Sequence, residues 1–186
     1  LLSRWSFLVY YTSFILVTLP LTPLIWTTIR RWIGRSAATI LIIVLFLAAI
    51  LFAFKVIRVL IKRNQWNWWR GSVLVACFLI FFQFFRFVDT PVEQIHFFEY
   101  GFLSFLACRC AESTWPRLEY WLLRFAVWGF AVVFGTLDEW IQYMLPNRVG
   151  DIRDVGLNAL AALFGLVIVS LLKNPLPCKK SSTTKT

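Results

Sequence analysis

The sequence contains a single histidine, His96, and lacks the short motifs that identify several enzyme classes. No GxSxG, P-loop, GxGxxG, HExxH or CxxC pattern occurs, so the usual signatures of serine hydrolases, nucleotide-binding proteins, zinc proteases and thioredoxin-like redox proteins are absent. Zinc, iron and manganese sites use imidazole and carboxylate ligands, and one histidine is few for such a site. We therefore expect no metal centre and no cofactor.

The sequence also lacks a disulfide framework, although it contains four cysteines. Cys77 lies within an apolar stretch, Cys108 and Cys110 lie near the end of another, and Cys178 belongs to the C-terminal tail. Such scattered positions do not resemble the paired cysteines of small secreted domains. We expect all four to be reduced thiols.

Apolar side chains dominate what is present. Hydrophobic residues make up 60% of the 186 residues, against roughly 45 to 50% in soluble domains, and the mean hydropathy is +0.73. A transmembrane helix needs about 20 mostly apolar residues. The sequence therefore predicts an all-α, polytopic transmembrane helix bundle of about six spans, with five as the alternative. The predicted spans are approximately Trp5–Ile29, Ser36–Phe54, Ser72–Val88, Ile95–Cys108, Tyr120–Leu137 and Val155–Leu172.

These spans suggest two regions and a tail. Residues 1–88 form N-terminal transmembrane helices joined by a basic cytoplasmic loop, residues 89–172 form a second transmembrane helical domain, and residues 173–186 form a polar basic tail. Pro20 and Pro23 interrupt the first span. Proline removes a backbone donor and clashes with the preceding helical turn, so we expect a kink there.

The formal net charge of +10 does not indicate a nucleic-acid partner, because the basic residues bracket apolar runs. Most of the 19 lysines and arginines fall on one side of the predicted bundle, the side that carries both termini. Cytoplasmic loops of membrane proteins are enriched in Lys and Arg. We therefore expect a multi-pass protein of the inner (plasma) membrane, surrounded by membrane lipids, with cytoplasmic termini and no bound nucleic acid.

Polar and ionisable residues form three clusters within this apolar sequence, in the segments EQIHFFEYG, GTLDEWIQ and NRVGDIRDVGLN. Ionisable groups at membrane depth are costly unless they pair or face a wet cavity, so these clusters mark a candidate site. At 3.6 residues per turn, the polar residues of each cluster share one helix face. The last of these faces continues through Gly165, and we expect it to pack closely against another helix. Because the predicted topology places all three clusters on the non-cytoplasmic side, we expect them to meet.

The residue types suggest roles within such a cavity. His96 could exchange protons with Glu93, Asp138 or Glu139. Arg148 and Arg153 could hold an anionic group beside the start of the last span. The alternative is a structural network in which arginines pair with aspartates and His96 bonds to a carboxylate. The candidate binding residues are Tyr100, Gln142, Arg148, Asp151, Arg153, Asp154 and Asn158.

The order HFFEYG, GTLDEWIQ and NRVGDIRDVGLNALAALFG resembles the VanZ-like family of small bacterial membrane proteins, over about Asp89 to Leu172. The resemblance implies a cell-envelope role, since the founding member is associated with low-level resistance to the glycopeptide teicoplanin. It implies no particular reaction. Many members have a basic residue where this chain has Gln94. The matching positions are His96, Tyr100, Asp138, Glu139, Gln142, Arg148, Asp151, Asp154, Asn158 and Gly165.

Two functions of different classes follow from these observations. The first is binding or modification of a lipid-linked or amphipathic cell-envelope molecule in a polar non-cytoplasmic cavity, with a role like that in glycopeptide (antibiotic) resistance. The alternative is a non-catalytic accessory subunit that packs against a larger membrane complex through its aromatic-rich spans. A transporter is disfavoured because no inverted repeat is visible. The sequence leaves enzymatic activity open.

Overall fold

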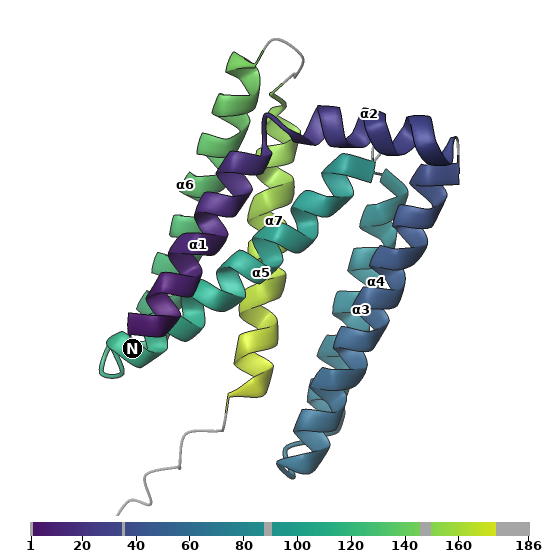
Figure 1. Ribbon diagram of the computed structural model, residues 1–186. Coiled ribbons are helices and arrows are strands. Elements are labelled where there is room, and N and C mark those ends of the chain that lie inside the picture. The colour runs from purple at the N-terminus through teal and green to yellow at the C-terminus, as the bar shows by residue number, and fades with distance from the viewer. Residues whose placement is uncertain (1, 35, 88–90, 146–149, 174–186) are drawn as a thin grey trace, which may run out of the picture.

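The computed structural model describes residues 2–34, 36–87, 91–145 and 150–173, which form seven α-helices (Figure 1). No strand occurs among these residues, so the predicted all-α class is confirmed. The helices are α1 (Leu2–Thr18), α2 (Thr22–Ile33), α3 (Ser36–Lys62), α4 (Trp68–Phe87), α5 (Pro91–Thr114), α6 (Tyr120–Met144) and α7 (Ile152–Leu172).

Within the described chain, three helices are long and apolar enough to cross a membrane, namely α3, α6 and α7. The bent pair α1 and α2 adds a fourth if it counts as one span. The prediction of about six spans is therefore not confirmed by helix length and composition. The apolar part of α4, Trp68–Gln83, is shorter. Charged and polar residues recur along α5 and lower its hydropathy.

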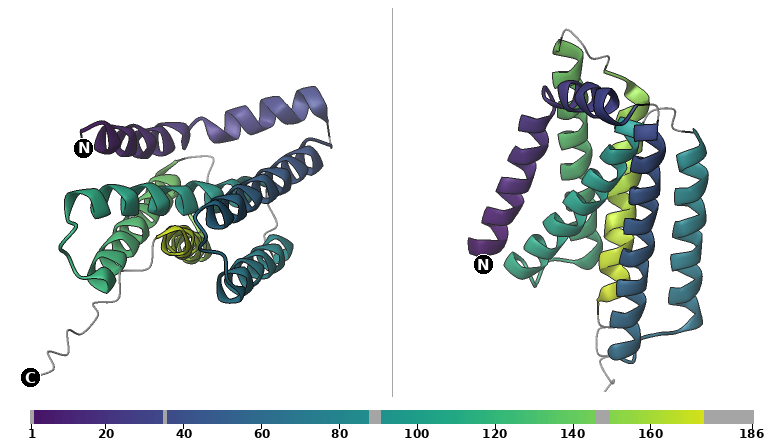
Figure 2. Two further views of the ribbon diagram at one scale, coloured as in Figure 1. Left: turned by 90° about the horizontal axis from the view of Figure 1, so that it is seen from below. Right: turned by 45° about the vertical axis from the view of Figure 1, so that its right-hand side comes forward.

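The expected kink in the N-terminal segment is present between α1 and α2. The two helices meet at an angle of 68°, with Pro20 in the break and Pro23 in the first turn of α2. The Leu21 backbone N–H donates to the Thr18 carbonyl at 3.0 Å and closes the turn. As a result, α2 lies across one end of the other helices instead of continuing along α1 (Figures 1 and 2).

The core lies among α5, α6 and α7, and α1 packs on α5. The closest approach is between α5 and α7, where Ser104 Oγ donates to the Ala162 carbonyl at 2.8 Å. A Cβ atom on Gly165 would collide with the Gly101 carbonyl oxygen and with Ser104 Oγ. Small residues permit such close packing of helices in membranes. The expected packing role of the Gly165 face is confirmed.

Helices α3 and α4 lie beside this core (Figure 2), and aromatic side chains of both contact it. The Phe46 ring of α3 meets the Phe81 ring of α4 edge to face at 5.8 Å, and Phe81 in turn lies 5.2 Å from the Phe97 ring of α5. Only 6% of the most apolar part of α3 is buried. Such an apolar exposed surface suits contact with lipid.

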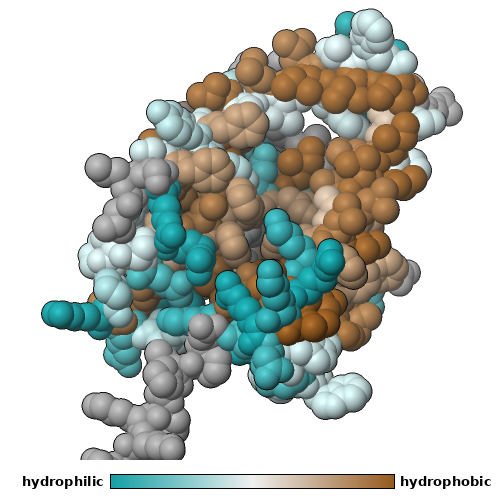
Figure 3. All heavy atoms as spheres, turned by 60° about the horizontal axis from the view of Figure 1, so that its bottom comes forward, coloured by the Kyte–Doolittle hydropathy of each residue, from teal (hydrophilic) through white to brown (hydrophobic). Residues whose placement is uncertain are grey.

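One end of the molecule carries a concentration of hydrophilic side chains (Figure 3). The beginning of α1, the α3–α4 turn, the α5–α6 turn and the end of α7 all lie at this end (Figure 1). Arg63 of the α3–α4 turn donates to the Leu172 carbonyl at 3.0 Å and so satisfies one of the last carbonyls of α7. The opposite end, where α5 and α7 begin and α6 ends, holds the candidate site.

Candidate functional site

Polar side chains converge where the first turns of α5 and α7 meet the last turns of α6. Most of them are buried, although the surrounding core is apolar. We name this group the acid cluster. Its members are His96, Glu99 and Tyr100 on α5, Asp138, Glu139 and Gln142 on α6, and Asn158 on α7.

Asp138 lies at the centre of the acid cluster and is fully buried. The Tyr100 hydroxyl donates to Asp138 Oδ2 at 2.7 Å, and Gln142 Nε2 donates to Oδ1 at 3.0 Å. His96 Nδ1 lies 3.4 Å from Oδ2, within electrostatic reach but outside hydrogen-bond geometry. The carboxylate is therefore held by neutral donors from two helices and faces an imidazole.

Glu139 connects the end of α6 to the start of α7. Its Oε1 accepts from Gln142 Nε2 at 3.2 Å, and its Oε2 accepts from the Asp151 backbone N–H at 3.2 Å. Gln142 thus bridges the two buried carboxylates. Asp151 caps α7, because its Oδ1 accepts from the Arg153 backbone N–H at 2.9 Å. This capping bond gives Asp151 a structural role at the edge of the cluster.

The polar atoms of Asn158 are fully buried, and neither has a hydrogen-bond partner among the described residues. The side chain lies against Gly135, where a Cβ atom would come within 3.0 Å of Asn158 Cβ and 3.3 Å of Tyr100 Cε1. An unsatisfied buried polar group costs roughly 1–3 kcal/mol, so it calls for an explanation. Here it lies at Gly135 together with Tyr100, the residue that donates to Asp138, and a ligand group or water could satisfy it.

Histidine and the acids do not assemble a recognisable metal site in the described part of the chain. No three His, Cys, Asp or Glu side chains converge there as a ligand set. His96 Nδ1 is also 3.7 Å from Glu99 Oε2, and its ring stacks near that of Tyr100 with the centroids 6.4 Å apart. The arrangement can bind hydrogen-bond donors and exchange protons.

The structure brings most of the residues predicted from sequence into one place. His96, Tyr100, Asp138, Glu139, Gln142 and Asn158 belong to the acid cluster, and Asp151 adjoins it.

Arg153 lies outside the acid cluster and is exposed at the start of α7. Asp154 is half-buried in the first turn of that helix, within electrostatic reach of Glu139. The side chain of Glu93 and all of Arg148 lie outside the part of the chain that the structure describes. The predicted grip of Arg148 and Arg153 on an anion therefore stays a prediction.

A second polar network, which sequence reasoning missed, lies at the opposite end of the same three helices. Arg124 of α6 is 6% exposed, and its Nη2 lies 2.6 Å from Glu112 Oε1. Lys173 Nζ lies 3.5 Å from the same oxygen, and the Arg124 guanidinium stacks 4.5 Å from the Tyr120 ring centroid. We name Cys108, Glu112, Tyr120, Arg124, Ser170 and Lys173 the basic cluster. In the sequence, Arg124 looks like any other basic residue near a membrane surface. Its role is visible only from its contacts with α5 and α7.

A model of the VanZ/LLP1 family matches residues 7–173. This region reaches from the first helix to the end of the last, so it begins far upstream of Asp89, where the resemblance in the motifs starts. Most of the first 88 residues, which precede the motifs that carry the resemblance, therefore also belong to the matched region. Neither a curated protein nor a solved structure matches the chain.

Proposed function

This chain belongs to the VanZ/LLP1 family of helical membrane proteins, and we propose that its acid cluster binds the polar part of a lipid-linked or amphipathic cell-envelope molecule. The observation that carries the proposal is that the two buried carboxylates have no lysine or arginine partner among the residues that the structure describes. Asp138 and Glu139 accept hydrogen bonds from neutral groups, and no described lysine or arginine pairs with either of them. Buried acids that lack a lysine or arginine partner are costly and are typical of functional positions in membranes.

The chemistry of the cluster selects the kind of group that it binds. Carboxylates accept hydrogen bonds only, so they favour a ligand that brings hydroxyl or ammonium donors. The orphaned amide of Asn158 offers one further acceptor and one further donor site beside them. A sugar or an amine-bearing head group meets both requirements. By the prediction from sequence, Arg148 and Arg153 would hold an anionic part of the same molecule.

Proton transfer is the reaction step that this arrangement supports best. Asp138 faces His96 Nδ1 and therefore favours the tautomer in which Nδ1 carries the proton. The other ring nitrogen, Nε2, is then free to accept a proton from a bound group. Glu139, and Glu93 as predicted from sequence, supply further carboxylates for the return of that proton.

The proposed topology has six crossings and places the site toward the outer leaflet of the plasma membrane. Helices α1, α3, α4, α5, α6 and α7 alternate in direction, while α2 lies across one end (Figure 1). The hydrophilic, lysine- and arginine-rich end would face the cytoplasm by the positive-inside rule. The acid cluster lies at the other end and therefore on the non-cytoplasmic side.

The substitution Asp138→Asn tests this function most directly. The full-length chain is purified in mild detergent from a bacterial membrane, and the molecules that remain bound are identified by mass spectrometry. Loss of a charge-assisted hydrogen bond weakens binding by about 1.5–3 kcal/mol, or roughly tenfold to a hundredfold. We expect the wild-type chain to retain an amphipathic molecule with a hydroxyl- or amine-bearing head, and the variant to lose most of it while remaining folded.

Thr136→Val is the matched control, because this exposed hydroxyl lies on the same helix and bonds only to the Val132 carbonyl. Equal retention by Asp138→Asn and Thr136→Val would contradict the proposal. A stoichiometric protein partner in place of a small molecule would favour the accessory-subunit function.

A further inference from the structure

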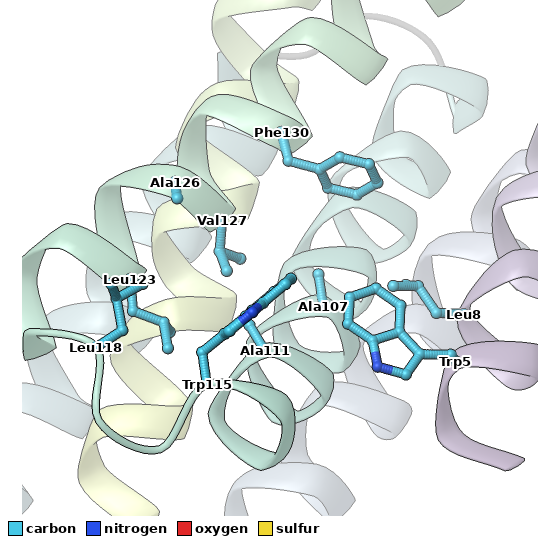
Figure 4. Close-up of a pocket in the computed structure, with 10 residues that line it drawn as sticks. All are labelled: Trp5, Leu8, Ala107, Ala111, Trp115, Leu118, Leu123, Ala126, Val127 and Phe130. Carbon is cyan, nitrogen blue, oxygen red and sulfur yellow. The ribbon is translucent and has the colours of Figure 1, made fainter. Parts of the chain in front are cut away.

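An apolar groove of about 430 Å³ lies between α1, α5 and α6, and no residue of the acid cluster lines it (Figure 4). Its floor is made by the small side chains of Ala107 and Ala111, and its sides include Trp5, Trp115 and Phe130. The volume is within the range of sites that hold small molecules, about 300–1,000 Å³. Almost all of its lining surface is apolar.

The walls of this groove are fixed by specific contacts. Trp5 Nε1 donates to Thr114 Oγ1 at 2.8 Å, which joins the start of α1 to the end of α5. The rings of Trp5 and Trp115 meet edge to face with their centroids 5.9 Å apart. Ordered water requires two to four polar partners, which the groove does not offer. A hydrocarbon chain is the occupant whose chemistry suits it.

Exposed basic residues adjoin the lining of the groove in the sequence. Arg4 directly precedes Trp5, and Arg117 lies between two residues of the lining in the α5–α6 turn. Both side chains are exposed, and neither forms an ion pair within the described residues. Arg109 is also exposed, on the last turns of α5, whereas Glu119 is an exposed acid in this turn. Cys110 Sγ donates to the Arg4 carbonyl at 3.4 Å, which fixes Arg4 beside that part of α5.

We propose that this groove binds one acyl chain of an anionic phospholipid, with the lipid phosphate held by Arg4 and Arg117. Long apolar walls and cations at one end match the two parts of such a lipid. Each basic residue near a membrane surface strengthens the attraction of anionic lipid about fivefold. The site is independent of the acid cluster, and its proposed ligand is a bulk membrane lipid.

The test is lipid retention by the full-length chain. The protein is reconstituted in vesicles of equal parts phosphatidylglycerol and phosphatidylcholine, extracted in mild detergent and examined by native mass spectrometry. We expect one tightly held phosphatidylglycerol per chain. Ala126→Phe should abolish its retention, because Ala126 is an exposed residue of the lining and a phenyl ring would fill the groove without disturbing the core.

Two matched controls accompany these variants. Ala76→Phe places the same ring on the exposed surface of α4 and should retain the lipid. Arg117→Gln should lower the preference for phosphatidylglycerol about fivefold, whereas Lys62→Gln, an equal loss of charge at the same end, should leave it unchanged.

Equal retention by the two phenylalanine variants would overturn the proposal. Equal retention of both phospholipids by the wild-type chain would overturn it as well. A photoactivatable group on the acyl chain of phosphatidylglycerol should label α1, α5 and α6 within the groove, and labelling of α3 or α4 alone would also contradict the assignment.

Discussion

The acid cluster and the basic cluster occupy opposite ends of the same three helices, yet their charged side chains have different kinds of partner. In the basic cluster, Glu112 faces both Arg124 and Lys173, so opposite charges are in contact. In the acid cluster, the carboxylates of Asp138 and Glu139 receive only hydroxyl, amide and backbone donors. The first network is complete within the chain, whereas the second has capacity for another donor.

This difference indicates different tasks. A buried ion pair with further hydrogen bonds holds its helices in one arrangement, since breaking it leaves an uncompensated charge. Arg124 also donates to Cys108 Sγ at 2.7 Å and to Ser170 Oγ at 3.4 Å, so it joins α6 to both α5 and α7. The acid cluster instead keeps unsatisfied polar atoms on Asn158 at a cost in stability. Such a cost is typical of a site that a ligand completes.

The largest effect is expected where both clusters depend on the same contact. Gly165 lies between them on α7, and Gly165→Val would drive a side chain into the backbone of Gly101. The two helices would have to separate, so both polar networks would lose their geometry. We expect almost no monodisperse protein after size-exclusion chromatography in detergent.

The control for this loss is a glycine without close neighbours. A Cβ atom at Gly129 or at Gly156 would meet nothing within 4 Å apart from its own helix and adjacent residues. Gly156→Val should therefore give nearly wild-type yields. Poor yields from both valine variants would mean that helix propensity, and not the α5–α7 contact, explains the effect.

The next largest effect is expected from a substitution that changes the basic cluster alone. Arg124→Leu would remove the closest partner of the half-buried Glu112 and leave Lys173 at 3.5 Å, so it should lower the free energy of unfolding by less than the roughly 3–5 kcal/mol of a fully buried pair, about 1–3 kcal/mol. The measurement is reversible unfolding by denaturant in mixed micelles. Adding Glu112→Gln should recover part of the lost stability, because the Glu112 carboxylate charge is then removed. Arg109→Leu is the exposed control and should cost less than about 1 kcal/mol.

The sequence predicted the main features of the acid cluster because they depend on local patterns. Helical spacing placed His96 and Tyr100 on one face of α5, and Asp138 and Gln142 on one face of α6. These two faces lie against each other, as expected, because the Tyr100 hydroxyl donates a 2.7 Å hydrogen bond to Asp138. Proline chemistry likewise predicted the break between α1 and α2.

The rest depends on contacts between distant segments. The binding role of Asp151 stays a prediction, and its side chain also caps α7, which only the backbone geometry at Arg153 reveals. Arg124 was one basic residue among many in the sequence, because its partners lie on two other helices. The number of spans was similarly obscured, since the polar residues that build the site make α5 less apolar.

The smallest effect on stability is expected from a leucine substitution in the acid cluster, Asn158→Leu. Asn158→Leu replaces two unpartnered polar atoms with apolar groups of similar volume. Because no hydrogen bond is broken, unfolding should become harder by about 1 kcal/mol or remain unchanged. The same denaturant experiment as for Arg124→Leu measures it, and the loss of stability expected for Arg124→Leu should be absent in Asn158→Leu.

Binding should respond in the opposite way. If Asn158 is kept for a ligand, Asn158→Leu should retain less of the amphipathic molecule that co-purifies with the wild-type chain, even though the variant is as stable. Arg124→Leu, assayed under conditions where it remains folded, should retain it. A stable Asn158→Leu protein with full retention would make Asn158 an unexplained packing residue, and a large loss of stability would mean that its amide has a structural partner. If the basic-cluster variant changes only stability and the acid-cluster variant changes only binding, then one network holds the helices together and the other binds the ligand.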